Sequence, residues 1–432
     1  MSGKKNFTRF FFIPELRNRI LITFFFILIF RIGTFVTLPG INVDKLNTES
    51  SGLLGLLDVF LGGAFGYKSI FALGIMPYIN ASIVIQLLSL AVPKFQKLQR
   101  EGRGGRAKIR KITKLLTLGI AIFQSFAFIS YSVPGDVLLI DKTVFVFLAM
   151  FFLTTGTMVC VWIGNRITDD GIGNGISTLI MIGIISSLPG AILDEFYLDQ
   201  SKNLLYLLLK ILFLGVILMF AVWINNAVRK IPLLYAKEFK YTRDIYTYRR
   251  QYLPLKLIGV GVMPIIFAQV IMFLISFGVG KFADKATWVM DISTSLNSYT
   301  SWGHNISFAC LIIIFSYLYT AVNMNPFQIA DDLKKADGFI PGIKPGKDTA
   351  DCVDTILNYL TFWGSLTLAV VAVLPAGAAT LGFSQHFSRF FGGTSLLIMV
   401  SVGMEMIQQI KSFILFHHYD HIMEFSDFYE EN

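Results

Sequence analysis

Long runs of apolar residues dominate this sequence, and the run from Phe71 to Val92 contains no charged residue. A helix that crosses a membrane needs roughly 20 such residues, because each adds about 1.5 Å toward a hydrocarbon core about 30 Å thick. Hydrophobic residues make up 54% of the chain and charged residues only 15%, so a water-soluble fold would expose an unusually large apolar surface. The sequence therefore predicts an all-α polytopic membrane protein.

Hydropathy predicts ten transmembrane helices. Their ranges are 20–38, 71–92, 115–133, 143–163, 176–192, 203–224, 257–280, 306–322, 355–374 and 393–413. An even number of spans puts both termini on one side of the membrane. Pro77 and Pro264 fall inside the second and seventh spans, where a proline is expected to interrupt helical hydrogen bonding and allow bending.

Lysine and arginine indicate which side that is. With the N-terminus inside, the cytoplasmic segments hold 28 of the 37 basic residues and the outer segments hold seven. Arg31 and Lys210 lie within spans, near enough to an end for their charges to reach the interface. Cytoplasmic loops carry such an excess, so both termini are expected inside. A net charge of +9 can also indicate a nucleic-acid binder, but here the basic residues fall between hydrophobic runs.

A short apolar piece, Leu53 to Phe60, precedes the second span and is followed by a cluster of glycines. Eight residues cannot cross a bilayer. Short or broken backbone at membrane depth is tolerated only where protein or a water-filled cavity surrounds it, which favours a small helix folded back as a plug. An amphipathic helix lying on the membrane surface fits the same spacing.

The predicted cytoplasmic loops contain features beyond the basic residues that the topology requires. The loop 93–114 reads as a solvated, flexible arm. The loop 225–256 mixes basic residues with tyrosines, a pattern that suits docking of an acidic protein or an RNA backbone, and its candidates are Arg229, Lys230, Tyr235, Lys237, Arg249 and Arg250. In the loop 323–354, two Pro-Gly pairs predict two tight turns around Lys344 and Lys347. For the loops 93–114 and 225–256, topology signals without any partner are the alternative.

Six stretches of this sequence, in this order, closely resemble the SecY family, the channel subunits of the bacterial protein translocase. The resemblance covers essentially the whole chain, and its most specific stretches are 69–79, 171–177, 231–237, 252–256, 338–346 and 392–398. It implies two inverted five-helix halves, 1–192 and 203–432, with a pore between them. It also implies that a plug of about 53–66 follows the first span, built on Leu53, Leu54, Leu56, Leu57, Asp58, Val59 and Phe60.

The resemblance further implies a ring of aliphatic side chains that seals the pore, formed by Ile79, Ile83, Ile180, Ile184, Ile266 and Ile398. The residues of each pair on the second and fifth spans are four apart and share a helix face, and converging apolar groups block ions by dewetting. The second and seventh spans would form a lateral gate that releases hydrophobic segments into lipid. Its polar candidates, including one from the third span, are Asn80, Ser82, Gln86, Gln124 and Gln269.

The implied partners are SecE-like and SecG-like membrane subunits, a SecA motor ATPase, the ribosome, signal sequences with their nascent chains, and lipid. The implied location is the bacterial inner membrane, although a plastid membrane stays open. Lys344 stands where the family pattern has arginine, whose planar fork makes paired contacts that lysine cannot make. Motor and ribosome docking through this tip is therefore the part of the resemblance that this sequence fits least closely.

Other functions fit the sequence less well. An ion-coupled small-molecule transporter with inverted repeats would place charged groups near the midplane, yet the only carboxylate in a predicted span is Glu405, near an inner end. An intramembrane enzyme would need catalytic groups in the membrane, whereas all five histidines are predicted in loops or the tail: His304, His386, His417, His418 and His421. The three cysteines are widely separated, so no metal or cofactor is expected. The sequence lacks a phosphate-binding loop, so energy for transport must come from a partner.

Overall fold

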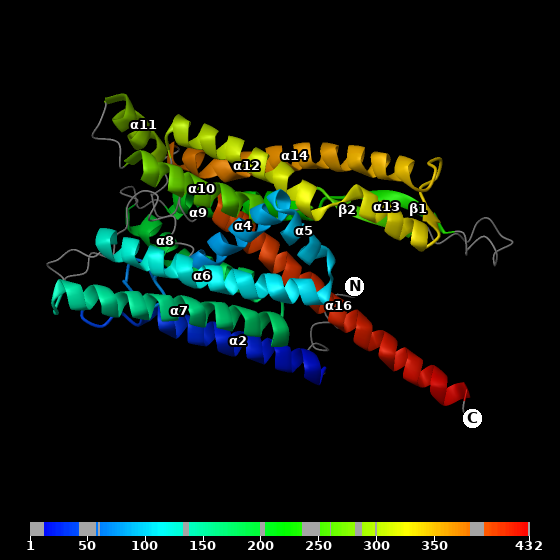
Figure 1. Ribbon diagram of the computed structural model, residues 1–432, viewed down its shortest axis with the longest axis horizontal. Coiled ribbons are helices and arrows are strands. Elements are labelled where there is room, and N and C mark those ends of the chain that lie inside the picture. The colour runs from blue at the N-terminus through cyan, green and yellow to red at the C-terminus, as the bar shows by residue number, and fades with distance from the viewer. Residues whose placement is uncertain are drawn as a thin grey trace. The chain divides into compact units, whose positions relative to one another are not determined.

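The computed structural model describes residues 13–42, 58, 61–132, 138–198, 204–235, 251–259, 261–280, 287–298, 300–380 and 393–430. These residues form helices and one small sheet (Figure 1). Within this part of the chain, nine helices are long and apolar enough to cross a membrane, and a further apolar helix, Met76–Ser89, is shorter. The predicted multi-pass helical membrane fold is confirmed.

Two compact units divide the chain: Met1–Leu198 with Ser401–Asn432, and Asp199–Val400. The first contains α2 (Pro14–Phe35), α4 (Met76–Ala91), α5 (Pro93–Arg100), α6 (Arg103–Ser132), α7 (Lys142–Asp170) and α8 (Gly175–Leu198). The second contains α9 (Leu204–Asn225), β1 (Val228–Tyr235), β2 (Gln251–Lys256), α10 (Met263–Gly280), α11 (Thr287–Asn297), α12 (Trp302–Asn323), α13 (Pro326–Lys335), β3 (Gly338–Phe339) and α14 (Lys347–Thr380). The last helix, α16 (Gly393–Glu430), has its first residues in the second unit and the rest in the first. The predicted halves, 1–192 and 203–432, stay a prediction.

In the first unit, α7 packs between α2 and α6, and α6 also packs on α4 (Figure 1). Phe145, Ala149 and Leu153 lie one turn apart on α7 and are completely buried in the core between these helices. Phe24 and Phe25 on α2 are 64% and 59% exposed. A helix with apolar residues on its buried and its exposed faces is typical of a membrane span, which agrees with the predicted environment.

The second and seventh spans begin later than predicted. Residues 71–75 are buried turns, and α4 starts at Met76; likewise residues 257–259, 261 and 262 form turns before α10 starts at Met263. Pro77 and Pro264 are therefore first-turn residues, where the missing amide hydrogen costs nothing because it would have no helical partner. The prediction that these prolines interrupt the two helices is wrong: they mark where the helices begin.

The loop 93–114 is not the flexible arm that its charge indicates. It forms α5 and the first turns of α6, separated by a tight turn in which Gly102 has a φ of +71°. A Cβ on Gly105 would lie only 1.8 Å from the carbonyl oxygen of Leu98, so α5 and α6 approach too closely for a side chain there. Close backbone approach at glycine thus orders a segment that looks disordered by composition.

The small sheet was not predicted, and it links the loops 225–256 and 323–354, the two large loops predicted on the cytoplasmic side. Its strand order is β2-β1-β3, with antiparallel pairing from Val228 opposite Lys256 to Leu233 opposite Gln251. On its other side, β1 pairs with β3 at Leu234 and Tyr235, and no further pairing on that side is seen among the described residues. Prolines are tolerated at unpaired strand edges, which explains how Pro232 and Pro254 fit into strands β1 and β2. Beneath the sheet, apolar side chains form one core with α13 and α14: Ile231, Leu233, Leu255, Leu333, Ile340, Val353 and Leu357.

Candidate functional site

Four of the six isoleucines predicted to seal a pore belong to the first unit and two to the second. Ile83 on α4, Ile184 on α8 and Ile398 on α16 are 4%, 0% and 1% exposed, and Ile79, Ile180 and Ile266 are half-buried. Ile79 also packs against the core cluster that contains Phe30 and Phe71. None of the six side chains is therefore exposed, as a seal that excludes water requires. Their convergence into one ring stays a prediction.

The polar gate candidates of the first unit lie on two helices that pack together, α4 and α6. The side-chain carbonyl oxygens of Asn80, Gln86 and Gln124 are buried and have no hydrogen-bond partner among the described residues. Ser82 is half-buried on the same α4, and Gln269 is 9% exposed on α10 in the second unit. An unpaired buried amide oxygen costs about 1–3 kcal/mol, so each of these three oxygens is available to accept a hydrogen bond from an added donor.

The plug candidates Leu53, Leu54, Leu56, Leu57, Val59 and Phe60 lie outside the described residues. The seventh, Asp58, is described, and its Oδ1 accepts hydrogen bonds of 3.0 Å from the backbone amides of Phe65 and Gly66. Arg31 on α2 donates to the carbonyl oxygen of Gly62 over 3.1 Å. The turns at 61–75 are therefore held in place by Asp58, which precedes them, and by Arg31 of α2.

Lys68 is a buried cation in the same segment. It is only 8% exposed, and its Nζ lies 5.1 Å from the ring centre of Phe65 and 5.9 Å from that of Phe128. Burial lowers the pKa of the Lys68 ammonium, and attraction to Asp58 partly opposes this change. Its φ of +50° is unusual for a residue with a side chain. Aromatic faces and a carboxylate thus replace water around this charge.

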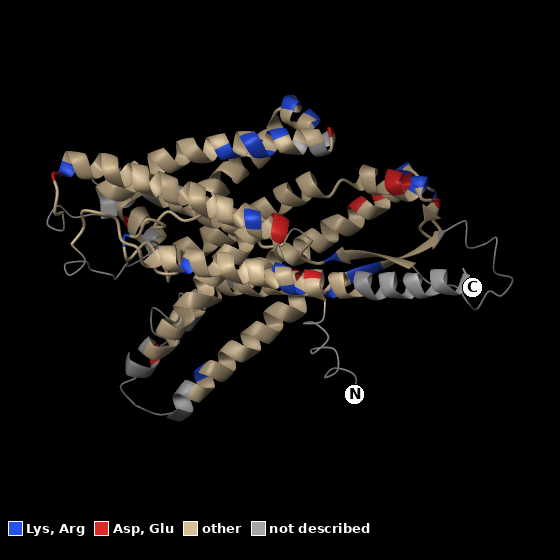
Figure 2. Ribbon diagram, turned by 90° about the horizontal axis from the view of Figure 1, so that it is seen from below, with Lys and Arg blue, Asp and Glu red and all other residues tan. Residues whose placement is uncertain are grey.

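The structure brings the two predicted docking loops together. β3, from the loop 323–354, pairs with the end of β1, from the loop 225–256, and the two share one apolar core. Arg229 and Lys230 on β1, and Lys344 and Lys347 beside the second Pro-Gly turn, are all exposed. Tyr235 is the last residue of β1. Lys237, Arg249 and Arg250 lie outside the described residues. Figure 2 shows charged residues gathered at the ends of the long helices and around the strands.

Both predicted tight turns at the tip are confirmed. Gly342 and Gly346 have φ angles of +81° and +112°, and the amide of Ile343 donates to the carbonyl of Ile340 over 3.1 Å. Ile340 is buried in the core beneath the sheet, and Thr349 donates to the carbonyl of Lys344 over 2.8 Å. The exposed Lys344 therefore sits on an anchored backbone, which reduces the entropy lost when a partner binds it.

The glycine-rich turn at 171–175 is a site that residue-by-residue reasoning missed. Its amides donate to side chains of three helices. Ile172 donates to Thr23 Oγ1 on α2 over 3.0 Å and Gly173 to Gln409 Oε1 on α16, both far away in the sequence, and Gly175 donates to the nearby Thr168 Oγ1 on α7 over 2.9 Å. The Arg19 guanidinium lies 4.8 Å from the ring centre of Phe413 and donates to the carbonyl of Gly171. The turn therefore holds α2, α7 and α16 together. In the sequence, the three glycines at 171, 173 and 175 were the feature that could have indicated this site.

The prediction for one histidine needs a correction. His304, predicted in a loop, lies in the first turn of α12, is 6% exposed and donates from Nδ1 to the carbonyl of Leu296 over 2.8 Å. His417, His418 and His421 fall within α16, which continues well past the predicted span, and His386 lies outside the described residues. Among the described residues, no group of three or more histidine, cysteine or acidic side chains could hold a metal ion.

Comparisons with known proteins agree on one family. The family model described as SecY matches residues 69–407. A protein translocase subunit SecY of Streptomyces scabiei is 37% identical over 424 residues, covering 94% of this chain and 96% of its own length. The same subunit of Staphylococcus epidermidis is 40% identical over 425 residues, with 94% and 96% covered.

Solved structures share the fold at low identity. A protein-conducting channel is 16% identical, with a TM-score of 0.66 and 92% of each chain covered. Sec61 in the canine ribosome-channel complex from the endoplasmic reticulum gives a TM-score of 0.61 at 16% identity, again with 92% of each chain covered. Taken with the family match and the fold, these findings identify the chain as a member of the SecY family of protein translocase channel subunits.

Proposed function

We propose that this chain is the central, protein-conducting channel of a translocase, through which unfolded polypeptides cross the membrane and hydrophobic segments pass sideways into lipid. The observation that carries this function is a family match at about 40% identity over nearly the full length, on a fold of many apolar helices. The family consists of channels rather than enzymes. An ion-coupled transporter is not favoured.

The proposed seal is the ring of Ile79, Ile83, Ile180, Ile184, Ile266 and Ile398. Its support is chemical: branched apolar side chains exclude ions by dewetting and still move aside for a passing chain. The burial of Ile83, Ile184 and Ile398 is compatible with a closed channel. The plug proposal, Leu53 to Phe60, is supported by its place between the first span and the anchored turns at 61–75.

The proposed lateral gate lies between α4 and α10, with Asn80, Ser82, Gln86 and Gln269 on these helices and Gln124 on α6. Polar contacts between membrane helices contribute only about 0.6 kcal/mol on average, so such a gate opens without a large energy input. A signal sequence is the proposed ligand that parts it. The unpaired amide oxygens on α4 and α6 support a gate whose polar groups exchange partners.

The proposed docking surface consists of the exposed basic residues on β1 and the adjoining tip, together with Tyr235, Lys237, Arg249 and Arg250. A motor ATPase of the SecA type and the ribosome are the proposed partners on this cytoplasmic face, and the solved Sec61 relative was bound to a ribosome. SecE-like and SecG-like subunits are the proposed membrane partners. We place the channel in the bacterial inner membrane with both termini in the cytoplasm, because 28 of the 37 basic residues then lie inside.

Reconstitution tests this function. Vesicles that contain the purified chain with its membrane subunits, a motor ATPase and ATP should protect an added unfolded secretory polypeptide from protease. Omitting ATP is the control and should abolish protection. Vesicles that fail to import the polypeptide, yet take up a small solute along an ion gradient, would support the transporter instead.

A further inference from the structure

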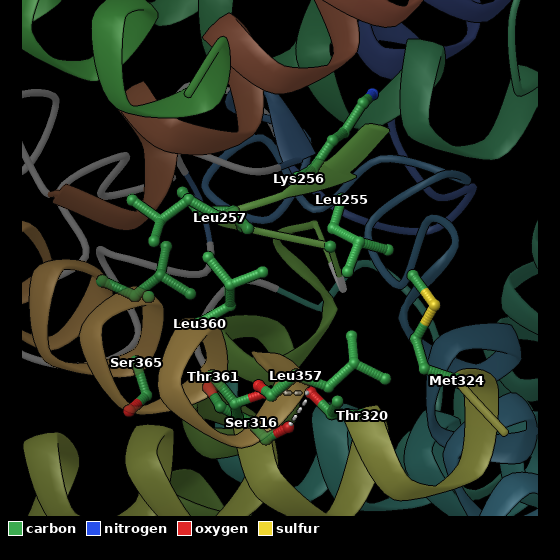
Figure 3. A pocket seen from close by; sticks show the side chains of 14 residues that line it. Leu255, Lys256, Leu257, Ser316, Thr320, Met324, Leu357, Leu360, Thr361 and Ser365 are labelled. Atoms are coloured by element: carbon green, nitrogen blue, oxygen red, sulfur yellow. Dashed lines mark hydrogen bonds between the residues drawn. The ribbon is translucent and has the colours of Figure 1, made fainter. Parts of the chain in front are cut away.

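A small pocket of about 30 Å³ lies in the second unit, beneath the segment that connects β2 to α10. Leu255, Leu257 and Ile258 cover one side of it, and α12 and α14 form the other. Most of its lining is apolar, but four hydroxyl side chains also line it: Ser316, Thr320, Thr361 and Ser365 (Figure 3). The ammonium of Lys256 points away from these hydroxyls in Figure 3, so the pocket presents no charge.

Three of these hydroxyls have already used their single hydrogen. Thr320 donates to the carbonyl of Ser316 over 2.8 Å, Thr361 to that of Leu357 over 2.8 Å, and Ser365 to that of Phe362 over 2.9 Å. A hydroxyl has one hydrogen to donate and two lone pairs that accept. The oxygens of Thr361 and Thr320 are 3.4 Å apart, which is long for a hydroxyl hydrogen bond. These oxygens therefore retain acceptor capacity.

Ser316 is the unusual member of the set. It is only 4% exposed, and its Oγ has no hydrogen-bond partner among the described residues. A buried hydroxyl without a partner is costly, and such groups in native proteins usually bind ordered water. Ser316 thus brings an unused donor to the same pocket in which Thr320 and Thr361 hold unused acceptors.

We infer that this pocket is a binding site for a single neutral water molecule, which accepts a hydrogen bond from Ser316 and donates to Thr320 and Thr361. A water needs about 10–15 Å³ of such space and two to four polar partners, and the pocket supplies both. The apolar walls and the absence of a charged group disfavour an ion. The site lies under the segment that connects β2 to α10. It does not depend on the docking role proposed for the sheet or on the gate role proposed for α10.

The direct test is a structure of the full chain in lipid at a resolution that shows ordered water. Density within 2.5–3.0 Å of Ser316 Oγ and of a threonine Oγ1 is expected. Thr320→Val combined with Thr361→Val keeps both side-chain shapes, leaves the water with Ser316 as its one remaining proposed partner, and should lose this density. Thr367→Val is the matched control, because Thr367 lies on the same helix but does not line the pocket. An empty wild-type pocket, or density that persists when both threonines are replaced by valine, would overturn the site.

Thermal unfolding of Ser316→Ala is a second test that is independent of resolution. If the pocket is dry, the substitution removes a buried hydroxyl without a partner and should raise the unfolding temperature. If a water is bound, the substitution breaks a hydrogen bond and should lower that temperature by about 1 °C. We expect the decrease. Protein transport plays no part in either measurement, so failure here would leave the channel function untouched.

Discussion

The hydroxyl oxygen of Thr23 on α2 accepts a hydrogen bond of 3.0 Å from the backbone amide of Ile172, 149 residues further along the chain. The same hydroxyl donates to the carbonyl of Arg19 over 2.8 Å, so both its donor and an acceptor site are used. Through this one side chain the first span holds the turn between α7 and α8.

Replacing Thr23 with valine should destabilise the protein. Thr23→Val keeps the shape but leaves the buried Ile172 amide without an acceptor, at a cost of about 1–3 kcal/mol. Thermal unfolding of the detergent-solubilised chain would measure this loss. Thr34→Val is the control, because Thr34 is also buried on α2 but donates to Arg31, three residues earlier in the same helix. Equal losses in the two variants would refute a special role for Thr23.

Gly175 should not tolerate a side chain, although it opens an α-helix in which alanine is intrinsically favoured. A Cβ at this position would lie 2.0 Å from the carbonyl oxygen of Gly164. Gly175→Ala is therefore expected to reduce the yield of folded, membrane-inserted protein severely. Gly190→Ala on the same helix meets nothing within 4 Å and should be neutral or slightly stabilising. Normal yield of Gly175→Ala would show that α7 and α8 pack less closely than described.

Because of Lys68, the stability of the folded protein should depend on pH in the alkaline range. The pKa of this lysine in the folded protein is lowered from the ordinary value of 10.5, mainly by burial, so the unfolded chain binds more protons between the lowered pKa and 10.5. Stability contributed by this lysine therefore increases as pH rises through that interval and is lost as pH falls. Measured against Lys68→Met, the unfolding temperature of the wild-type protein should rise as the pH increases toward 10.5.

Lys142→Met provides the comparison for Lys68, because it removes an exposed lysine from the same predicted side of the membrane. It reports how the loss of a surface lysine alone affects unfolding over this pH range. A wild-type advantage over Lys68→Met that stays constant, or that shrinks as pH rises, would contradict the assigned direction.

The tip of the predicted docking surface is tested by charge reversal. Lys344→Glu should impair motor-driven import of a secretory polypeptide into vesicles, because an exposed base on an anchored backbone becomes an acid. Membrane insertion of the channel itself should be unaffected, since Lys344 is exposed and the core beneath it is unchanged. Lys334→Glu, on the exposed side of α13, is a matched reversal outside the tip. Normal import by Lys344→Glu would exclude this role.

Much of the fold followed from the sequence because a membrane span is a long and simple signal. The charge-free runs predicted helices, and two Pro-Gly pairs predicted turns that Gly342 and Gly346 form. Pro77 and Pro264 were misread because hydropathy shows where apolar residues lie but not where helical hydrogen bonding begins. Residues 71–75 are as apolar as α4, yet they fold into buried turns.

The rest depends on contacts between distant segments. β1 and β2 carry prolines and charges that disfavour strands, and only pairing with each other and with β3 makes them a sheet. Likewise, no local pattern reveals that Gln409 would bind the amide of Gly173, 236 residues away. For the candidate ring, the spacing of Ile79 and Ile83 placed them on one helix face, but selecting six isoleucines from so many required a family resemblance.

The most direct measurement of the central claim is photo-cross-linking from adjacent positions of α8 to a secretory polypeptide arrested part-way through the channel. A photoreactive residue would replace either Ile184, which is 0% exposed, or Ile185, which is 39% exposed and points about 100° away around the helix. A polypeptide that passes through the proposed ring should cross-link strongly from position 184 and only at background level from position 185. Cross-linking from position 185 alone, or from neither position while transport proceeds, would contradict the account.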